Sequence, residues 1–166
     1  KNIKIDSASG GIETTVSGEY AEVSSASGAI TVKAQGTVNE LKAESTSGKI
    51  DVTTDEVKTL TVESTSGEVS VKAKKAGKLT VSTTSGRIKT EIDEIENAVK
   101  ISSTSGRISI VLPENTDFTA VFSSTSGKFD SDFALVKSGN EYKAGNGGGK
   151  NNISTTSGDA SISKKQ

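Results

Sequence analysis

The amino-acid sequence predicts an all-β protein, a single-stranded parallel β-helix (β-solenoid) of about seven to eight rungs with 18–21 residues each, in a right-handed coil. Three observations predict this fold. A Ser-Gly pair recurs at a nearly constant interval, apolar residues alternate with polar ones on both sides of each pair, and the chain has a single proline, Pro113. Repetition at about twenty residues is typical of stacked solenoids.

The repeat is clearest in its glycines, most of which close a Ser-Thr-Ser-Gly segment. Their successive spacings are 18, 20, 19, 19, 20, 21 and 31 residues, so only the last step is clearly longer. Ser17-Gly18 also matches the pair but lies out of phase. We call the in-phase residues the corner glycines and name each rung after its own: Gly10, Gly28, Gly48, Gly67, Gly86, Gly106, Gly127 and Gly158.

Apolar residues occupy fixed columns relative to the corner glycine. Positions seven and five before it are mostly apolar, and so are positions two and four after it. A period of two indicates strands, and the change of parity at the glycine indicates a bend. Each rung is therefore predicted to be strand, corner, strand and a variable turn. The column two residues after the corner contains Ile12, Ile30, Ile50, Val69, Ile88, Ile108, Phe129 and Ala160.

Equivalent strands of successive rungs are expected to pair in parallel, about 4.8 Å apart. The third residue before each corner glycine is Ser or Thr in all eight rungs, and we expect these hydroxyls to face inward and form stacked hydrogen-bonded ladders. Glycine is required at the corner either because its φ is positive or because a stacked neighbour leaves no space for a Cβ atom. An earlier apolar position is predicted to form a short third side, with Val38, Val57, Ala76, Ile95 and Phe118.

Residues 1–166 are predicted to form one β-solenoid domain with an insertion at about 130–150 before the terminal rung. The insertion contains Phe133, Leu135, Val136 and Tyr142, and we expect it to fold as a hairpin over one side or near the C-terminal end. The terminal rung is degenerate, because Asn151 and Ala160 occupy its core columns.

The composition excludes several classes of chemistry. The chain has no cysteine and no histidine, so disulfides, thiolate or histidine metal sites and a Ser-His-Asp triad are excluded. We expect no cofactor and no enzymatic activity. The net charge of −1 gives no field to attract nucleic acid, and no apolar run is long enough to span a membrane.

Two outward columns are candidate binding surfaces. Glu44 and Glu63 occupy the same position in adjacent rungs and could bind a cation or act as an acid–base pair, although two solvated glutamates are the simpler interpretation. Arg87 and Arg107 follow their corner glycines directly and could bind a carboxylate or phosphate, although a solvated edge balanced by Glu68 would also explain them. Asp130 and Asp132 resemble half of a calcium loop, but the other ligands of such a loop are missing. None of these residues is assigned as catalytic.

The repeated Ser-Thr-Ser-Gly-x-Ile/Val-x-Val segment resembles the bacterial adhesin-like family of unknown function called the toastrack domain. Residues 145–158, Gly-Asn-Gly-Gly-Gly-Lys-Asn-Asn-Ile-Ser-Thr-Thr-Ser-Gly, are similar to the usual ending of that family. The resemblance covers nearly the whole chain. It implies a β-solenoid displayed outside the cytoplasmic membrane, often joined to an anchor or to envelope stress-response components, and it implies no catalytic residues.

The sequence therefore favours a non-enzymatic, extracytoplasmic structural or binding module, a cell-surface adhesin whose ligand is unknown. Cell-envelope glycan or protein is the expected kind of partner, and end-to-end self-association through the terminal rungs is a further expectation. The alternatives are a carbohydrate-active enzyme on the same scaffold and an envelope-stress signalling or assembly module. Because the chain starts at Lys1 rather than Met, we expect a processed or engineered piece from which a leader or membrane anchor has been removed.

Overall fold

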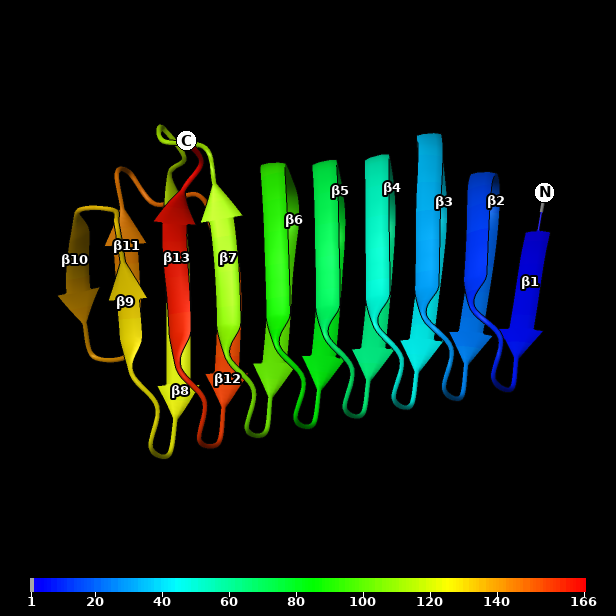
Figure 1. Cartoon of the computed structure of the whole chain (residues 1–166). Helices are drawn as coiled ribbons and strands as arrows, with labels where there is room; N and C mark the ends of the chain where they lie inside the picture. The colour runs from blue at the N-terminus through cyan, green and yellow to red at the C-terminus, as the bar shows by residue number, and fades with distance from the viewer. Residues whose placement is uncertain (1) are drawn as a thin grey trace.

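The computed structural model describes residues 2–166, and these residues form β-strands and no helix. The strands stack side by side into a long, narrow solenoid with the N-terminus at one end, as Figure 1 shows. The all-β, parallel-stacked fold expected from the sequence is thereby confirmed. The strands are β1 (Asn2–Ser7), β2 (Ile12–Ser25), β3 (Ile30–Ser45), β4 (Ile50–Ser64), β5 (Val69–Thr83), β6 (Ile88–Ser103), β7 (Ile108–Leu112), β8 (Phe118–Ser124), β9 (Phe129–Ser131), β10 (Leu135–Ser138), β11 (Glu141–Ala144), β12 (Gly149–Thr155) and β13 (Ala160–Lys164).

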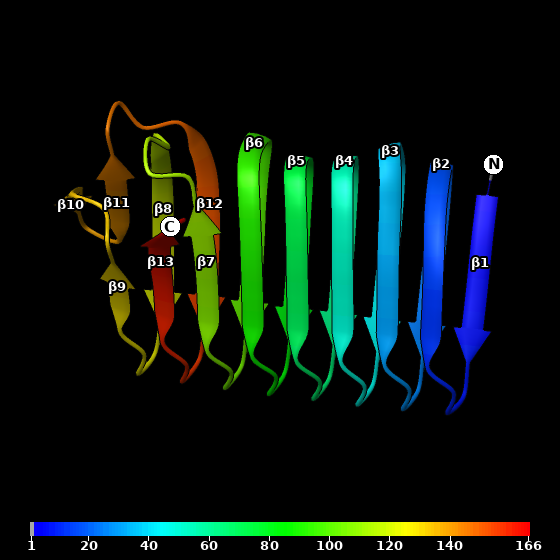
Figure 2. The same cartoon turned by 45° about the horizontal axis from the view of Figure 1, so that its top comes forward.

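Strands β2 to β6 each run without interruption from one corner to the next. The turn expected between rungs is, in this part of the chain, a bend within one continuous strand at the far edge (Figure 2). Gln35 and Gly36 lie in such a bend outside the register of β3 and β4, and Gly36 has a φ of 69°. Rungs of unequal length are accommodated there by shifts of register, for example between Ala34 and Thr37. A β-bulge of this kind absorbs an extra residue and bends the strand.

The opposite edge consists of the Ser-Gly corners, which lie directly above one another. None of the corner glycines has a positive φ. A Cβ atom on Gly86 would instead lie 1.8 Å from the carbonyl oxygen of Gly67 in the preceding rung. Gly10 begins the column, and a Cβ atom there would meet only the Ser7 hydroxyl, at 3.3 Å. Of the two reasons for glycine, close stacking of the backbone is the one that applies.

The hydroxyl three residues before each corner binds within its own rung. The N–H of Gly48 donates to Ser45 Oγ at 2.9 Å, and the N–H of Gly86 donates to Thr83 Oγ1 at 3.0 Å. The expectation of ladders between rungs is therefore wrong in the part of the chain that the structure describes. A side-chain hydroxyl that accepts the N–H of a residue further along the turn stabilises the turn locally, as in other Ser/Thr motifs.

The core is a series of thin apolar layers, one for each rung. Ile30, Ile50 and Ile88 are fully buried two residues after their corners, and Leu41 and Leu60 are fully buried before theirs. Between these columns, the bend is filled by side chains of the expected third side. Val38, Val57, Ala76 and Phe118 are buried there, and Ile95 is half-buried.

The last rung along the chain does not lie last in space. Strand β12 pairs in parallel with both β6 and β8, and β13 pairs with both β7 and β9. The Gly158 rung therefore lies between the Gly106 and Gly127 rungs, and Figure 2 shows its strand β13 between β7 and β9. The expectation that each rung pairs with the next one along the sequence is wrong for these rungs, and Gly158 is not the terminal corner.

A hairpin and a group of aromatic rings close the C-terminal end. Strands β10 and β11 form an antiparallel hairpin, and β11 pairs antiparallel with β8, on the side away from β12. Because this hairpin already occupies the free side of β8, the last rung pairs on the other side. The four phenylalanines of the chain gather here with Tyr142: Phe118 packs edge-on against Phe133, and Phe129 contacts both Phe122 and Tyr142. At the other end, β1 hydrogen-bonds only to β2 among the described strands, and end-to-end association stays a prediction.

Candidate functional site

A long hollow of the described surface runs along the strand ends just before the corners. Its first part has a volume of about 680 Å³ and its second part about 350 Å³. We call the two parts together the hydroxyl groove, because Ser and Thr side chains form nearly all of its lining. The first part is lined by Ser7, Ser24, Ser25, Ala26, Glu44, Ser45, Thr46, Glu63, Ser64, Thr65 and Ser82, and the second by Thr83, Ser102, Ser103, Thr104, Ser123, Ser124, Thr125, Ser154, Thr155 and Thr156.

The regularity of the hydroxyl groove follows from the repeat. The fourth, third and second residues before each corner lie side by side on consecutive strands, and the register of β3 and β4 pairs Glu44 with Glu63 and Ser45 with Ser64. The middle residue is buried and binds the corner glycine, whereas Thr46 and Thr65 are exposed. The groove thus presents hydroxyls at the spacing of parallel strands, about 4.8 Å.

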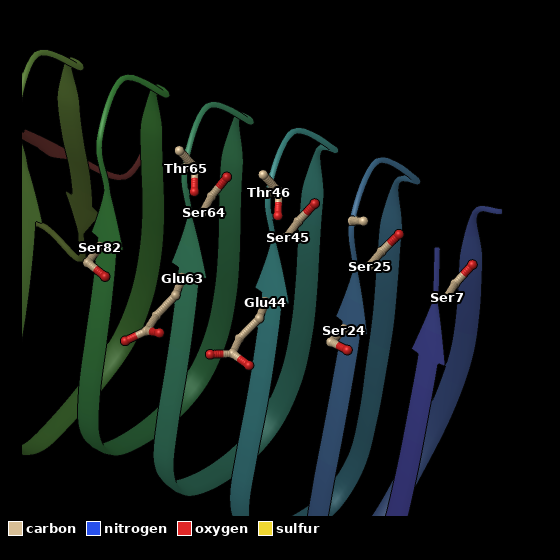
Figure 3. Close-up of a pocket in the computed structure, with 11 residues that line it drawn as sticks. Ser7, Ser24, Ser25, Glu44, Ser45, Thr46, Glu63, Ser64, Thr65 and Ser82 are labelled. Carbon is tan, nitrogen blue, oxygen red and sulfur yellow. The ribbon is translucent and has the colours of Figure 1, made fainter. Parts of the chain in front are cut away.

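Among residues 2–166, Glu44 and Glu63 are the only charged residues that line the hydroxyl groove. Figure 3 shows the two carboxylates side by side, with Ser24 and Ser82 on the flanking strands. Lys42 Nζ lies 2.9 Å from a carboxylate oxygen of Glu44, and this contact holds the pKa of Glu44 below its usual value. A hydrogen bond with Glu44 raises the pKa of Glu63, because a protonated Glu63 can donate to the ionised Glu44.

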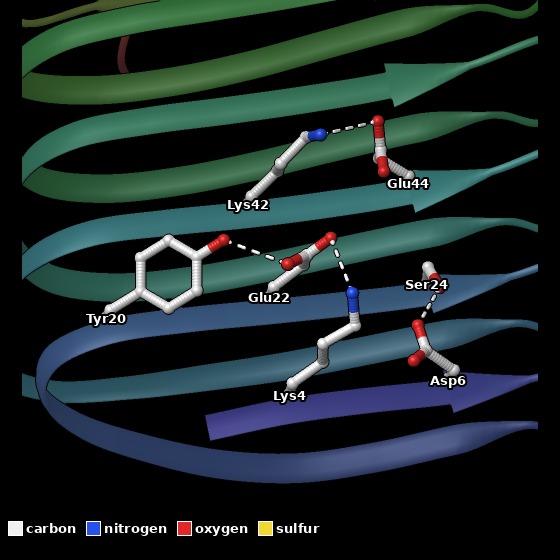
Figure 4. A network of polar contacts seen from close by, with 7 residues as sticks. All are labelled: Lys4, Asp6, Tyr20, Glu22, Ser24, Lys42 and Glu44. Carbon is white, nitrogen blue, oxygen red and sulfur yellow. Dashed lines mark hydrogen bonds and ion pairs between the residues drawn. The ribbon is translucent and has the colours of Figure 1, made fainter. Parts of the chain in front are cut away.

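A polar network continues from Glu44 toward the N-terminal end. Lys4 Nζ lies 3.5 Å from Glu22 Oε1, and the Tyr20 hydroxyl donates to Glu22 Oε2 at 2.9 Å. The Ser24 hydroxyl donates to Asp6 beside it, as Figure 4 shows. Each of these contacts joins neighbouring strands or alternate residues of one strand. The network therefore fixes the side chains at the rim of the groove.

The geometry of the glutamate pair disfavours glycoside hydrolysis. A retaining glycosidase separates its two carboxyl groups by about 5 Å, and the two groups flank the scissile bond. Glu44 and Glu63 are in register on adjacent parallel strands and point to the same side of the sheet, so both would approach one face of a bound sugar. The residues that the structure describes also contain no group of three or more Asp, Glu, His or Cys that could hold a metal ion.

The arginine column predicted from the sequence lies apart from the hydroxyl groove. Arg87 and Arg107 line a separate hollow of about 490 Å³ around the corner glycines, together with Ser66, Glu68, Ser85, Gly86, Ser105 and Gly106. The structure thus brings each predicted pair together, but in two different sites. Outward columns of Ser and Thr were expected from the sequence as faces for weak multivalent contacts, but their gathering into one groove before the corners was not.

The half calcium loop does not assemble in the structure. Asp132 Oδ2 accepts the N–H of Lys164, at 3.4 Å, and Ser131 Oγ accepts the N–H of Phe133. The two aspartates therefore lie beside β13, where Asp132 serves a backbone contact. In the described part of the chain, no helix is long and apolar enough to cross a membrane.

The fold and the hydroxyl-lined face define a β-solenoid repeat protein. The chain belongs to the family described as Toastrack DUF4097, whose model matches residues 1–163. No curated protein matches the chain. Among solved structures, a "putative cell adhesion protein" from Clostridium sporogenes ATCC 15579 is similar over 99% of this chain and 93% of its own, with 15% identity and a TM-score of 0.41.

Proposed function

We propose that this chain is a non-enzymatic binding module of the cell surface, and that the hydroxyl groove holds an extended glycan along the axis of the solenoid. The observation that carries the proposal is the repetition of hydroxyls in register on consecutive strands. An extended glycan is itself a periodic chain of hydroxyls, and the rise of one pyranose unit is similar to the strand spacing. Successive sugars would therefore meet equivalent groups on successive rungs.

The chemistry of the groove selects among glycans. Its only charged lining residues in the described part of the chain are Glu44 and Glu63, which favour a neutral or amino-bearing sugar over an acidic one. The lining contains no aromatic side chain, so each sugar would be held by hydrogen bonds alone. Hydrogen bonds that replace contacts with water contribute little individually. Useful affinity would come from many rungs acting together on one long ligand.

The cell-surface setting rests on the toastrack family, whose members are typically displayed outside the cytoplasmic membrane. Treatment of intact producing cells with a protease that does not enter them tests this setting. The proposal expects loss of the chain from intact cells, with a cytoplasmic protein left undigested as the control. Survival of the chain until the cells are lysed would contradict it.

Binding is tested with oligosaccharides of increasing length, neutral and amino-bearing, monitored by NMR or calorimetry. We expect affinity to rise with length, and to fall for Thr65→Val, which removes an exposed groove hydroxyl. Lys89→Ala is the matched control, because Lys89 is exposed but does not line the groove. Equal affinity of Thr65→Val and the parent chain would contradict the groove as the site. Release of shortened glycan that stops in Glu63→Gln would instead establish the enzymatic alternative.

A further inference from the structure

The chain uses arginine in only one place. Its 20 basic residues include just two arginines, Arg87 and Arg107, and all the others are lysines. The two arginines lie in consecutive rungs, because Ile88, next to Arg87, pairs with Ile108, next to Arg107. The N–H of Ile88 also donates to the carbonyl oxygen of Arg107, at 2.9 Å. Their backbones are therefore one strand spacing apart, about 4.8 Å.

The column that contains the arginines has a carboxylate on each side. Glu68 precedes Arg87 in the stack, and Asp159 follows Arg107, because the Gly158 rung lies next to the Gly106 rung. Each carboxylate contacts a lysine residue on the side of the stack away from the arginines, and Glu68 also lines the hollow that contains them. Glu68 Oε1 lies 3.9 Å from Lys49 Nζ, and Asp159 Oδ1 accepts the N–H of Lys128 at 2.9 Å.

The two guanidinium groups are thus left without an intramolecular counter-ion. Neither forms an ion pair with any residue in the described range 2–166. Both side chains are exposed and line the hollow of about 490 Å³, which Ser85 and Ser105 also line. Like charges opposite each other on adjacent strands destabilise a sheet. A ligand that neutralises both arginines would remove this repulsion.

We propose that Arg87 and Arg107 form a binding site for a phosphate group, supported by the Ser85 hydroxyl. A guanidinium group presents a rigid fork of donors that matches phosphate oxygens, whereas a lysine ammonium acts as a point charge. A planar carboxylate is satisfied by one such fork. The tetrahedral phosphate has oxygens directed to more than one side and can accept from both forks at once. The site shares no residue with the hydroxyl groove and does not depend on the proposed glycan function.

The test uses the intact chain labelled with ¹⁵N. Because the chain has two arginines, the arginine Nε–H region of the NMR spectrum contains two signals, which Arg87→Lys assigns. Inorganic phosphate and a glycerol phosphodiester are titrated separately at constant ionic strength, with sodium chloride as the reference. We expect both signals to move and to saturate with one common dissociation constant. Tighter binding of the diester identifies a phosphodiester polymer as the source, and tighter binding of inorganic phosphate identifies a terminal phosphate.

Lysine variants distinguish the effect of the guanidinium geometry on phosphate binding from the effect of positive charge alone. Arg87→Lys and Arg107→Lys keep the charge, and each is expected to weaken phosphate binding roughly fivefold to tenfold because one fork is lost. Lys128→Gln is the control, since Lys128 lies in the same column beyond Asp159. Shifts that grow linearly and match those caused by chloride would overturn the proposal. Unchanged affinity in both lysine variants would overturn it as well.

Discussion

A Cβ atom built on Gly67 would lie 1.9 Å from the carbonyl oxygen of Gly48, the corner glycine of the preceding rung. The atom it meets belongs to the backbone, so a substitution must push two rungs apart. At Gly10, the first corner glycine of the sequence, the nearest atom is the Ser7 hydroxyl, at 3.3 Å. A larger side chain is therefore expected to be tolerated much better at Gly10 than at Gly67, although both glycines close the same motif.

We expect Gly67→Ala to lower the free energy of unfolding by about 1–3 kcal/mol, the range for overpacked interiors. Gly10→Ala is the matched control and is expected to cost well under half as much, because a hydroxyl can move aside. Urea denaturation followed by circular dichroism measures both. Equal midpoints for the two variants would show that close stacking is not what requires glycine at the corner.

The order of the last rungs is tested by chemical cross-linking, which the absence of cysteine makes straightforward. Ser154 pairs with Ser102 on β6 and with Ser123 on β8, so Ser102 and Ser123 are two strand spacings apart, about 9–10 Å. We expect a short bifunctional thiol reagent to join cysteines at 102 and 154, introduced as Ser102→Cys and Ser154→Cys. The pair Ser102→Cys and Ser123→Cys serves as the control. Preferential cross-linking of that control would mean that the rungs stack in chain order.

Asn151 is a polar residue in an apolar column. Its side chain is 1% exposed, its Oδ1 atom has no hydrogen-bond partner, and its Nδ2 atom donates weakly to Gly149 at 3.4 Å. Leucine occupies the same column in three other rungs, at Leu41, Leu60 and Leu79. We expect Asn151→Leu to stabilise the fold by about 1–2 kcal/mol, since an unsatisfied buried acceptor is removed.

Urea denaturation measures the effect of Asn151→Leu. A higher midpoint with an unchanged dependence of the free energy of unfolding on urea concentration shows that the folded state is more stable, and not that the unfolded state has changed. Asn152→Leu is the control, because Asn152 is exposed on the same strand and should change stability little. A lower midpoint for Asn151→Leu than for the parent chain would contradict the assignment of Asn151 as a destabilising core residue.

The Glu44–Glu63 pair should make stability depend on pH. The pKa of Glu63 is raised by its contact with Glu44. The contribution of Glu63 to the free energy of unfolding is therefore complete at low pH and is lost as the pH rises through the pKa of the folded state. Above that point two carboxylates face each other. We expect Glu63→Gln to stabilise the chain by about 0.5 kcal/mol at neutral pH and to have no effect below about pH 4.

Unfolding midpoints of the parent chain and Glu63→Gln between acidic and neutral pH provide the comparison, and added salt should narrow the difference. Glu68→Gln is expected to destabilise the chain slightly at neutral pH, because Glu68 lies near Lys49 and not beside another carboxylate. A Glu63→Gln variant less stable than the parent at neutral pH would show that the pair is held by attraction, for example to a bound cation.

Much of the fold could be predicted because its information is local. The alternation around each corner assigns Ile30, Ile50 and Ile88 to the core without any knowledge of their neighbours, and the structure buries all three. The pairing of Glu44 with Glu63 followed in the same way, because two rungs of similar length stack in register. The inward hydroxyls were correctly placed, but their acceptor role toward the corner N–H required the geometry of the bend.

The sequence by itself determined the rung, its corner, its core columns and which side chains share an outward column, because the repeat imposes a period of two on every strand. Only the tertiary structure decided which rung lies beside which. The Gly158 rung could pair with several edges equally well by pattern, and the β10–β11 hairpin occupies one side of β8 and leaves the other to β12. That choice places Asp159 rather than Lys128 beside Arg107. Such a neighbour depends on contacts between segments far apart in the chain, which no local pattern contains.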